Sequence, residues 1–223
     1  MNARHAAWIL AAALGICASQ AFGVTPAAHP HLEEVARPYE KNIQDGGYLP
    51  AAMSTAGKLV RAAGFAVGEA GSTGGIKRYT RDVLHLLDPV AYPEGPEIGM
   101  GLEPAARGAI DALERAAGAE GATDELRRRV GRVQTCMRNV LEWSAEIEET
   151  ADSLLASDDP ERIRNLAEDI RERTRWILAG HAPGPSGDVG WSDGNAEPGL
   201  EQAALYMNLL LRAEELPGVE LPM

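Results

Sequence analysis

The sequence predicts an all-α protein built as an antiparallel helical bundle. Apolar residues recur at alternating three- and four-residue steps, the spacing of one face of an α-helix. Residues that start and stop helices bound these stretches, and no stretch shows the sustained alternation of a β-strand. The chain has 223 residues, 45% of them hydrophobic and 24% charged, which is typical of one globular domain or two small ones.

Residues 1–23 follow the pattern of an export signal peptide. Arg4 supplies the positive charge, residues 6–16 are apolar, and small residues precede cleavage points after Ala21 and Gly23. The apolar run is too short to span a bilayer, which needs about 20 residues. We therefore expect an exported protein that is periplasmic or extracellular after cleavage. A buried N-terminal helix is the alternative.

Residues 24–50 are expected to be loosely ordered, because four prolines and a Gly-Gly pair interrupt them. The pattern is compatible with a short helix over 32–43 that bends at Pro38. The helical bundle is predicted over residues 51–215, with a short tail at 216–223.

The first half of the bundle is predicted to be a helical hairpin followed by a third helix. Helical spacing of apolar residues predicts helices over 53–70 and 76–88, and an Asp-Pro pair ends the second. A Gly/Pro-rich loop follows at 93–101. Pro104 then suits the first turn of a helix that extends to about Ala117.

The second half repeats this order with a longer first helix. An apolar stripe sustained over several heptads predicts one helix at 123–157. Asp159-Pro160 is a helix start, and the helix that follows is expected to end at Gly180. A second Gly/Pro-rich loop, 181–199, leads to a last helix at 200–211.

A weak internal repeat relates the two halves. The stretches 101–113 and 199–211 both begin Gly-Leu-Glu and continue as helices, and each follows a hairpin and a loop. We expect two duplicated three-helix units, 51–117 and 123–214, with the two loops at comparable ends of the bundle. Chance similarity between Ala-rich helices is the alternative.

The charge and cysteine content exclude several classes of protein. The chain has 33 acidic and 21 basic residues, so nucleic-acid binding, which depends on basic residues, is not expected. Lipidation at Cys17 is disfavoured because Ile16 precedes it where a small residue is needed. Beyond the signal only Cys136 remains, so no disulfide scaffold forms. Apolar neighbours such as Met137 favour a buried Cys136 over a reactive thiol.

No catalytic motif finds the context that it needs. Residues 190–194 match Gly-x-Ser-x-Gly, but they lie in a loop and no histidine follows Ser192. Cys-x-x-Cys-His, for covalent haem, and Glu-x-x-His, for a di-iron bundle, are absent from the sequence. We therefore expect a protein that is not an enzyme and that requires no cofactor.

A divalent cation is the one cofactor for which the sequence offers candidate ligands. His29 and His31 flank a proline, and they could hold Cu or Zn. His181, Asp188 and Asp193 share the second loop, where their oxygens and imidazole could bind a cation such as Ca²⁺. Solvated side chains are the simpler interpretation of both groups.

Two further features are interpreted as solvated helix surface. His85 lies on the polar side of its predicted helix, where we expect it to pair with Asp88. Glu142, Glu146 and Glu149 form an acidic ridge on the long helix.

Three segments resemble a loose group of exported, all-helical bacterial proteins without an established activity. They are 136–143 (Cys-Met-Arg-Asn-Val-Leu-Glu-Trp), the second loop, and 203–207 (Ala-Ala-Leu-Tyr-Met), and the resemblance covers about 53–212. Members of the group tend to carry a histidine pair on the second helix and Asp/Gly-rich loops that suggest cation sites. This chain has Tyr79 and Asp82 instead of the pair, so the resemblance does not by itself imply a metal.

The leading hypothesis is an exported, non-catalytic protein that binds an envelope protein or a small ligand. A periplasmic metal or haem carrier is the alternative, and an enzyme with a loop-based site is less favoured. Because long loops in compact domains are often functional, we expect binding at the two loops, with contributions from Glu97, Asp188, Trp191 and Asp193. The other interpretation of the loops is that they are only linkers.

Export is tested by the intact mass of the protein purified from its native host. We expect a chain that begins at Phe22 or Val24, because small residues precede both positions. A mass that retains Met1, or a lipid adduct at Cys17, would contradict this expectation.

Overall fold

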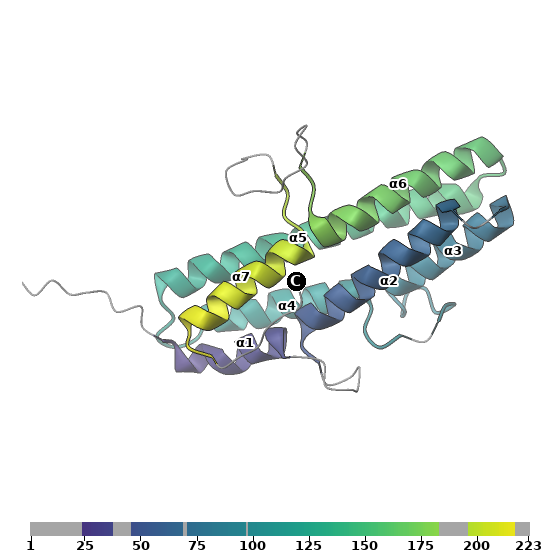
Figure 1. Cartoon of the computed structure of the whole chain (residues 1–223). Helices are drawn as coiled ribbons and strands as arrows, with labels where there is room; N and C mark the ends of the chain where they lie inside the picture. Colours follow the sequence, from purple (N-terminus) through teal and green to yellow (C-terminus); the bar gives the residue numbers. More distant parts are fainter. Residues whose placement is uncertain (1–23, 38–45, 69–70, 97, 183–195, 217–223) are drawn as a thin grey trace, which may run out of the picture.

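The computed structural model describes residues 24–37, 46–68, 71–96, 98–182 and 196–216 (Figure 1). These residues form a short 3₁₀ helix and seven α-helices without any strand, which confirms the predicted all-α bundle. The elements are η1 (Pro26–Ala28), α1 (His29–Ala36), α2 (Tyr48–Gly68), α3 (Thr73–Leu87), α4 (Leu102–Ala117), α5 (Asp124–Ala156), α6 (Pro160–Ala179) and α7 (Leu200–Ala213). Residues 1–23, which the sequence predicts to be a signal peptide, lie outside the described residues.

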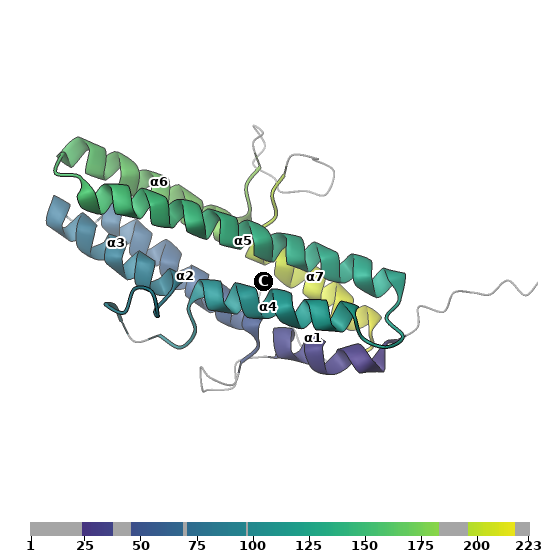
Figure 2. The same cartoon turned by 180° about the vertical axis from the view of Figure 1, so that it is seen from behind.

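The helices form four antiparallel columns (Figures 1 and 2). α1 and α2 follow one another along the first column, α3 and α4 along the second, and α6 and α7 along the fourth. The third column is α5, a single helix of 33 residues that spans about 50 Å. One half of the bundle therefore consists of α2, α3, α6 and part of α5, and the other half of α1, α4, α7 and the rest of α5.

The two Gly-Leu-Glu stretches have the same structural role. Gly101 and Gly199 are the N-cap residues of α4 and α7. A Cβ at Gly101 would lie 2.7 Å from the carbonyl oxygen of Leu87, and one at Gly199 would lie 2.6 Å from that of Trp176. Glycine is therefore needed where each helix starts against the end of the preceding helix of its column. The repeat in the sequence marks these two junctions.

The junctions do not lie at the ends of the bundle, where we expected the loops. Both fall near the middle of its length, because α3 meets α4 and α6 meets α7 there. Figures 1 and 2 also place them on opposite sides of the bundle. The expectation was wrong because it treated each hairpin and its following helix as one bundle, whereas the third helix of each unit extends its column into the other half.

The segment before residue 51 is more ordered than the sequence suggested. Residues 24–37 form η1 and α1, and α2 begins at Tyr48. Leu32 and Val35 are fully buried, and the Thr25 N–H donates to the Glu214 carboxylate at 2.6 Å. The prolines were misleading, since those of η1 and α1 lie in the first turn, where no N–H is required. Residues 38–45, including Pro38, are outside the described part.

Small residues allow the columns to approach closely. The inner face of α4 buries five alanines: Ala105, Ala106, Ala109, Ala112 and Ala116. On the same helix, a Cβ at Gly108 would lie 2.3 Å from the Tyr48 ring, so α2 packs directly on this glycine. None of the described helices is both long and apolar enough to cross a membrane.

Cys136 is fully buried in α5, as the sequence predicted. Its thiol donates to the Arg132 carbonyl oxygen at 3.3 Å. Burial raises the pKa of the Cys136 thiol to about 12, so the nucleophilic thiolate is scarce at neutral pH.

The close contact at Gly108 is tested by a matched pair of glycine substitutions. Gly108→Ala should lower the free energy of unfolding by about 1–3 kcal/mol, because its methyl group has no room beside Tyr48. Gly131→Ala in α5 should raise it by about 0.5–1 kcal/mol, because nothing lies within 4 Å of the added Cβ and alanine favours the helix. Urea denaturation of the wild type and of each variant measures both changes. Two changes of the same sign would contradict the packing of α2 on α4.

Candidate functional site

The structure describes three of the five residues that the sequence nominated as metal ligands, His29, His31 and His181, and each has different neighbours. His29 Nε2 lies 3.7 Å from Glu214, at the end of the bundle where α7 ends. His31 faces Glu34 and Arg115 instead, and Arg115 Nε donates to His31 Nδ1 at 3.4 Å. His181 packs on Trp176, with 4.1 Å between the ring centroids. Within the described ranges, no three His, Cys, Asp or Glu side chains are grouped as a metal site would require.

The residues nominated for partner binding cannot be placed. Glu97, Asp188, Trp191 and Asp193 lie outside the described residues, in or beside the two loops. The described flanks of the second loop are tied together, because His181 and Glu197 exchange backbone hydrogen bonds of 2.8 Å. The Asn139 side chain of α5 also donates to the Pro198 carbonyl oxygen at 3.0 Å.

The predicted acidic ridge is partly neutralised. Glu142 and Glu149 are exposed, but Glu146 accepts a hydrogen bond of 2.7 Å from Arg173 of α6. Arg173 also lies over the Trp176 ring. The ridge is thus largely ordinary helix surface, and the more unusual glutamate of α5 is its neighbour Glu148.

His85 is a buried residue, and its assignment to the surface was wrong. The residue is only 6% exposed, and segment 88–96 covers its ring through contacts at Tyr92, Gly95 and Pro96. Nδ1 lies 2.6 Å from the Tyr92 carbonyl oxygen, and Nε2 lies 2.8 Å from the Pro96 carbonyl oxygen. Asp88 does not pair with His85, because its carboxylate accepts the backbone N–H groups of Val90 and Ala91.

The same segment carries Tyr92 to a group of carboxylates. The Tyr92 hydroxyl lies close to the Glu148 carboxylate of α5, and the interaction of the two side chains contributes to the pKa of each. Burial, followed by the charge of Glu148, raises the pKa of Tyr92 to about 12. Burial also raises the pKa of Glu148, with a further contribution from the negative charge of Glu103. Asp152 raises both pKa values, so these groups lie in a common negative field.

Glu103 reaches this field from the first turn of α4. It is buried, with 7% of the residue exposed, and its carboxylate accepts a hydrogen bond of 3.0 Å from Arg107 one turn later. Arg107 is itself exposed, so solvent weakens its compensation of the Glu103 charge. The carboxylates therefore remain in excess around the Tyr92 hydroxyl.

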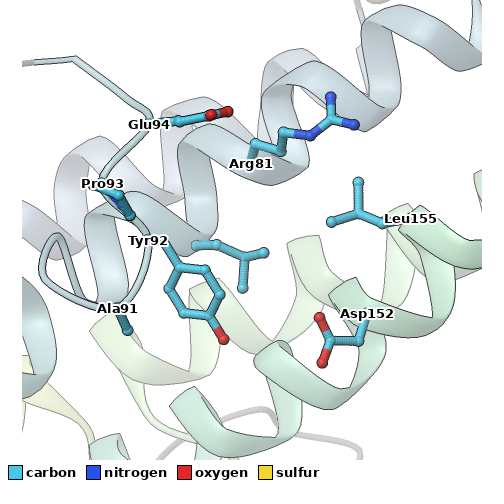
Figure 3. A pocket seen from close by; sticks show the side chains of 8 residues that line it. Arg81, Ala91, Tyr92, Pro93, Glu94, Asp152 and Leu155 are labelled. Carbon is cyan, nitrogen blue, oxygen red and sulfur yellow. The ribbon is translucent and has the colours of Figure 1, made fainter.

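A pocket of about 280 Å³ opens beside Tyr92, between α3 and α5 (Figure 3). Its lining residues are Arg81, Leu84, Ala91, Tyr92, Pro93, Glu94, Asp152 and Leu155. In Figure 3 the Tyr92 ring extends from the loop towards α5, and Asp152 and Leu155 face it from that helix. The pocket thus combines an apolar interior with one basic and two acidic side chains.

No pattern in the sequence predicts this pocket. Tyr92, Glu103, Glu148 and Asp152 come from a loop and two helices, and no motif links them. Two features of the sequence could have drawn attention to these residues. Glu103 belongs to the repeated Gly-Leu-Glu stretch, and Tyr92 is an aromatic residue in a loop otherwise rich in glycine and proline.

The electrostatic description of Glu148 predicts a pH-dependent stability. Its raised pKa means that the native state binds a proton more tightly than the unfolded state, so the wild type loses stability as pH rises above the ordinary range of glutamate, about 4.3. Glu148→Gln keeps an acceptor for Tyr92 without the charge. At pH 7 it should be more stable than the wild type, by less than about 1 kcal/mol because solvent screens the site.

The measurement is urea denaturation at pH 7 and at pH 4, where the difference should disappear. Glu149→Gln is the matched control on an exposed neighbour, and it should change stability little at either pH. If Glu148→Gln is instead less stable than the wild type at pH 7, and this deficit becomes smaller at pH 4, the raised pKa of Glu148 is contradicted.

No family model, no curated protein and no solved structure matches this chain. The geometry of the described residues is therefore what bears on its function.

Proposed function

We propose that the chain is an exported, non-catalytic binding protein of the cell envelope, and that it binds an amine-bearing ligand in the pocket beside Tyr92. The observation that carries this proposal is the combination of an apolar pocket with an excess of carboxylates. Small-molecule sites are typically concave and mostly apolar, with a few polar groups that orient the ligand.

The charges favour an ammonium group. Asp152 and Glu94 line the pocket, and the charges of Glu148 and Glu103 act on the Tyr92 hydroxyl. Arg81 is the one basic residue of the lining. Burial contributes most to the raised pKa values of Tyr92 and Glu148, and neighbouring carboxylates raise both values further. A cation that enters the pocket therefore lowers the electrostatic energy of these groups.

The apolar part of the lining selects what accompanies the ammonium group. Leu84 and Leu155 come from facing helices, and Pro93 and the Tyr92 ring close the loop side. These surfaces suit a short alkyl chain, whose burial contributes about 0.8 kcal/mol per methylene group. A volume of about 280 Å³ limits the ligand to a small molecule or to one lysine side chain of an envelope protein.

The same groups are poorly suited to catalysis. A general acid or base works best when its pKa is close to the working pH, and the pKa of Tyr92 is raised to about 12. Cys136 is buried in the core with a similarly raised pKa, and it is not part of the pocket lining. These properties favour binding over group transfer.

The proposal is tested with pentylammonium and pentanoate, which share an alkyl chain and differ in charge. Titration calorimetry and NMR shifts of the pocket residues should show binding of pentylammonium but not of pentanoate. Asp152→Asn should weaken the binding several-fold, because it removes a charge that faces the ligand. Glu149→Gln, on the exposed face of the same helix, should leave it unchanged.

Equal binding of the two probes, or loss of binding in the Glu149 variant but not in the Asp152 variant, would contradict the proposal. Pull-down of envelope proteins with the wild type and Asp152→Asn separates the two sources of the ammonium group. A partner captured only by the wild type indicates a lysine side chain.

A further inference from the structure

Both ring nitrogens of His85 face carbonyl oxygens. Nδ1 lies 2.6 Å from the oxygen of Tyr92, and Nε2 lies 2.8 Å from the oxygen of Pro96. A carbonyl oxygen only accepts hydrogen bonds, so each contact is favourable only if the nitrogen carries a proton. A neutral imidazole has one N–H, and it would place a lone pair against one of the two oxygens.

We propose that His85 is an imidazolium when segment 88–96 is closed over it, so that protonation of His85 fastens this segment to α3. Two donated hydrogen bonds hold the segment at lower pH. As the pH rises and His85 loses one proton, one of the two bonds is lost and the segment is released. Histidine is the side chain whose charge ordinarily changes between pH 5 and 8.

The charged surroundings are compatible with a cation at this position. α3 contributes Arg81, and the segment contributes Asp88 and Glu94. α4 contributes the Glu103–Arg107 pair, and α5 contributes Glu148 and Asp152, which share one field with Asp88. α2 reaches the end of this loop through an uncharged group, the Thr55 hydroxyl, which donates to the Met100 carbonyl oxygen at 3.0 Å. Carboxylates outnumber basic groups in this set.

The fit of the segment on the ring depends on Gly95. A Cβ at this position would lie 2.2 Å from Cγ of His85, so the backbone rests directly on the imidazole. Any side chain at position 95 would lift the segment from the ring. This gives a way to open the segment without removing the histidine.

Release of the segment would also change the pocket, a consequence that rests on the proposed function. The backbone of Tyr92 is held by His85, and the side chains of Ala91, Tyr92, Pro93 and Glu94 form the loop side of the pocket. The pocket wall is therefore built when His85 is protonated, and binding of the amine should weaken as the pH rises.

The test uses the ligand-free protein with ¹⁵N-labelled histidine. At pH 5.5 the NMR signals of the His85 ring should show protons on both nitrogens, and at pH 8 they should show one. The Tyr92 amide, which donates to the Asp88 carbonyl oxygen at 2.9 Å, reports closure of the segment. Its hydrogen-exchange protection factor, corrected for intrinsic rates, should fall at least about tenfold from pH 5.5 to pH 8.

Two glycine variants separate the segment from the rest of the fold. Gly95→Ala should abolish protection of the Tyr92 amide at both pH values while amides in α5 stay protected. Gly74→Ala, on α3, is the control, because its Cβ would meet only Ser72 Oγ at 3.9 Å. It should keep the pH dependence of the wild type.

A neutral His85 ring at pH 5.5, or equal protection of Tyr92 at both pH values in the wild type, would overturn the inference. Neither measurement involves a ligand. If the segment responds to pH as described but pentylammonium does not bind at pH 5.5, the proposed function fails and the protonation-dependent closure stands.

Discussion

The architecture depends on one uninterrupted apolar stripe along α5. Val133, Val140, Ile147 and Leu154 recur every seven residues and are fully buried, so this helix contributes to the core of both halves. The other three columns are each made of two helices. The α3–α4 and α6–α7 junctions both contact α5. Asn139 of α5 contacts the α6–α7 junction, and Glu148 of α5 contacts the α3–α4 junction. A bend in α5 would therefore displace both junctions.

The interruptions are what give this bundle its polar features. A continuous helix satisfies its backbone hydrogen-bonding groups internally. A column made of two helices has two extra helix ends and a connecting loop near the middle of the bundle, and their backbone groups need other partners. On the α3–α4 side this loop is held by the His85 ring and by the Tyr92 hydroxyl, which connect it to α3 and α5. Tyr92, which connects the loop to α5, also lines the pocket, so the chemistry of the pocket follows from how the column is interrupted.

Most of the fold was predictable because its signals are local. Asp159 caps α6 and Gly180 follows its last residue, as expected, and α5 begins within one residue of its predicted start, with Thr123 as its N-cap. The predicted boundaries that differ have local causes too: Pro50 lies inside α2, near its start, although the helical bundle was expected to begin only at residue 51. The prediction of loops at the bundle ends failed for a different reason, since the direction in which a helix leaves a loop is set by packing against other columns.

The pocket was not predictable, because it depends on a loop that folds back. His85 lies on the polar side of α3, so the helix alone predicts an exposed side chain. The residue is buried because the segment around Gly95 covers it. Glu148 is one of several glutamates on α5, and only the approach of Tyr92 distinguishes it from Glu149. Such contacts join residues that are distant in sequence, so periodicity carries no information about them.

The α3–α4 loop is attached to α5 through Tyr92 and Glu148, and a double-mutant cycle measures this attachment directly. Tyr92→Phe, Glu148→Ala and the double variant are compared with the wild type by urea denaturation at pH 7. If the hydroxyl donates to the carboxylate, the two substitutions are coupled by about 1 kcal/mol. Additive effects, equal within about 0.3 kcal/mol, would show that the two side chains do not interact and that the pocket wall is not held in this way.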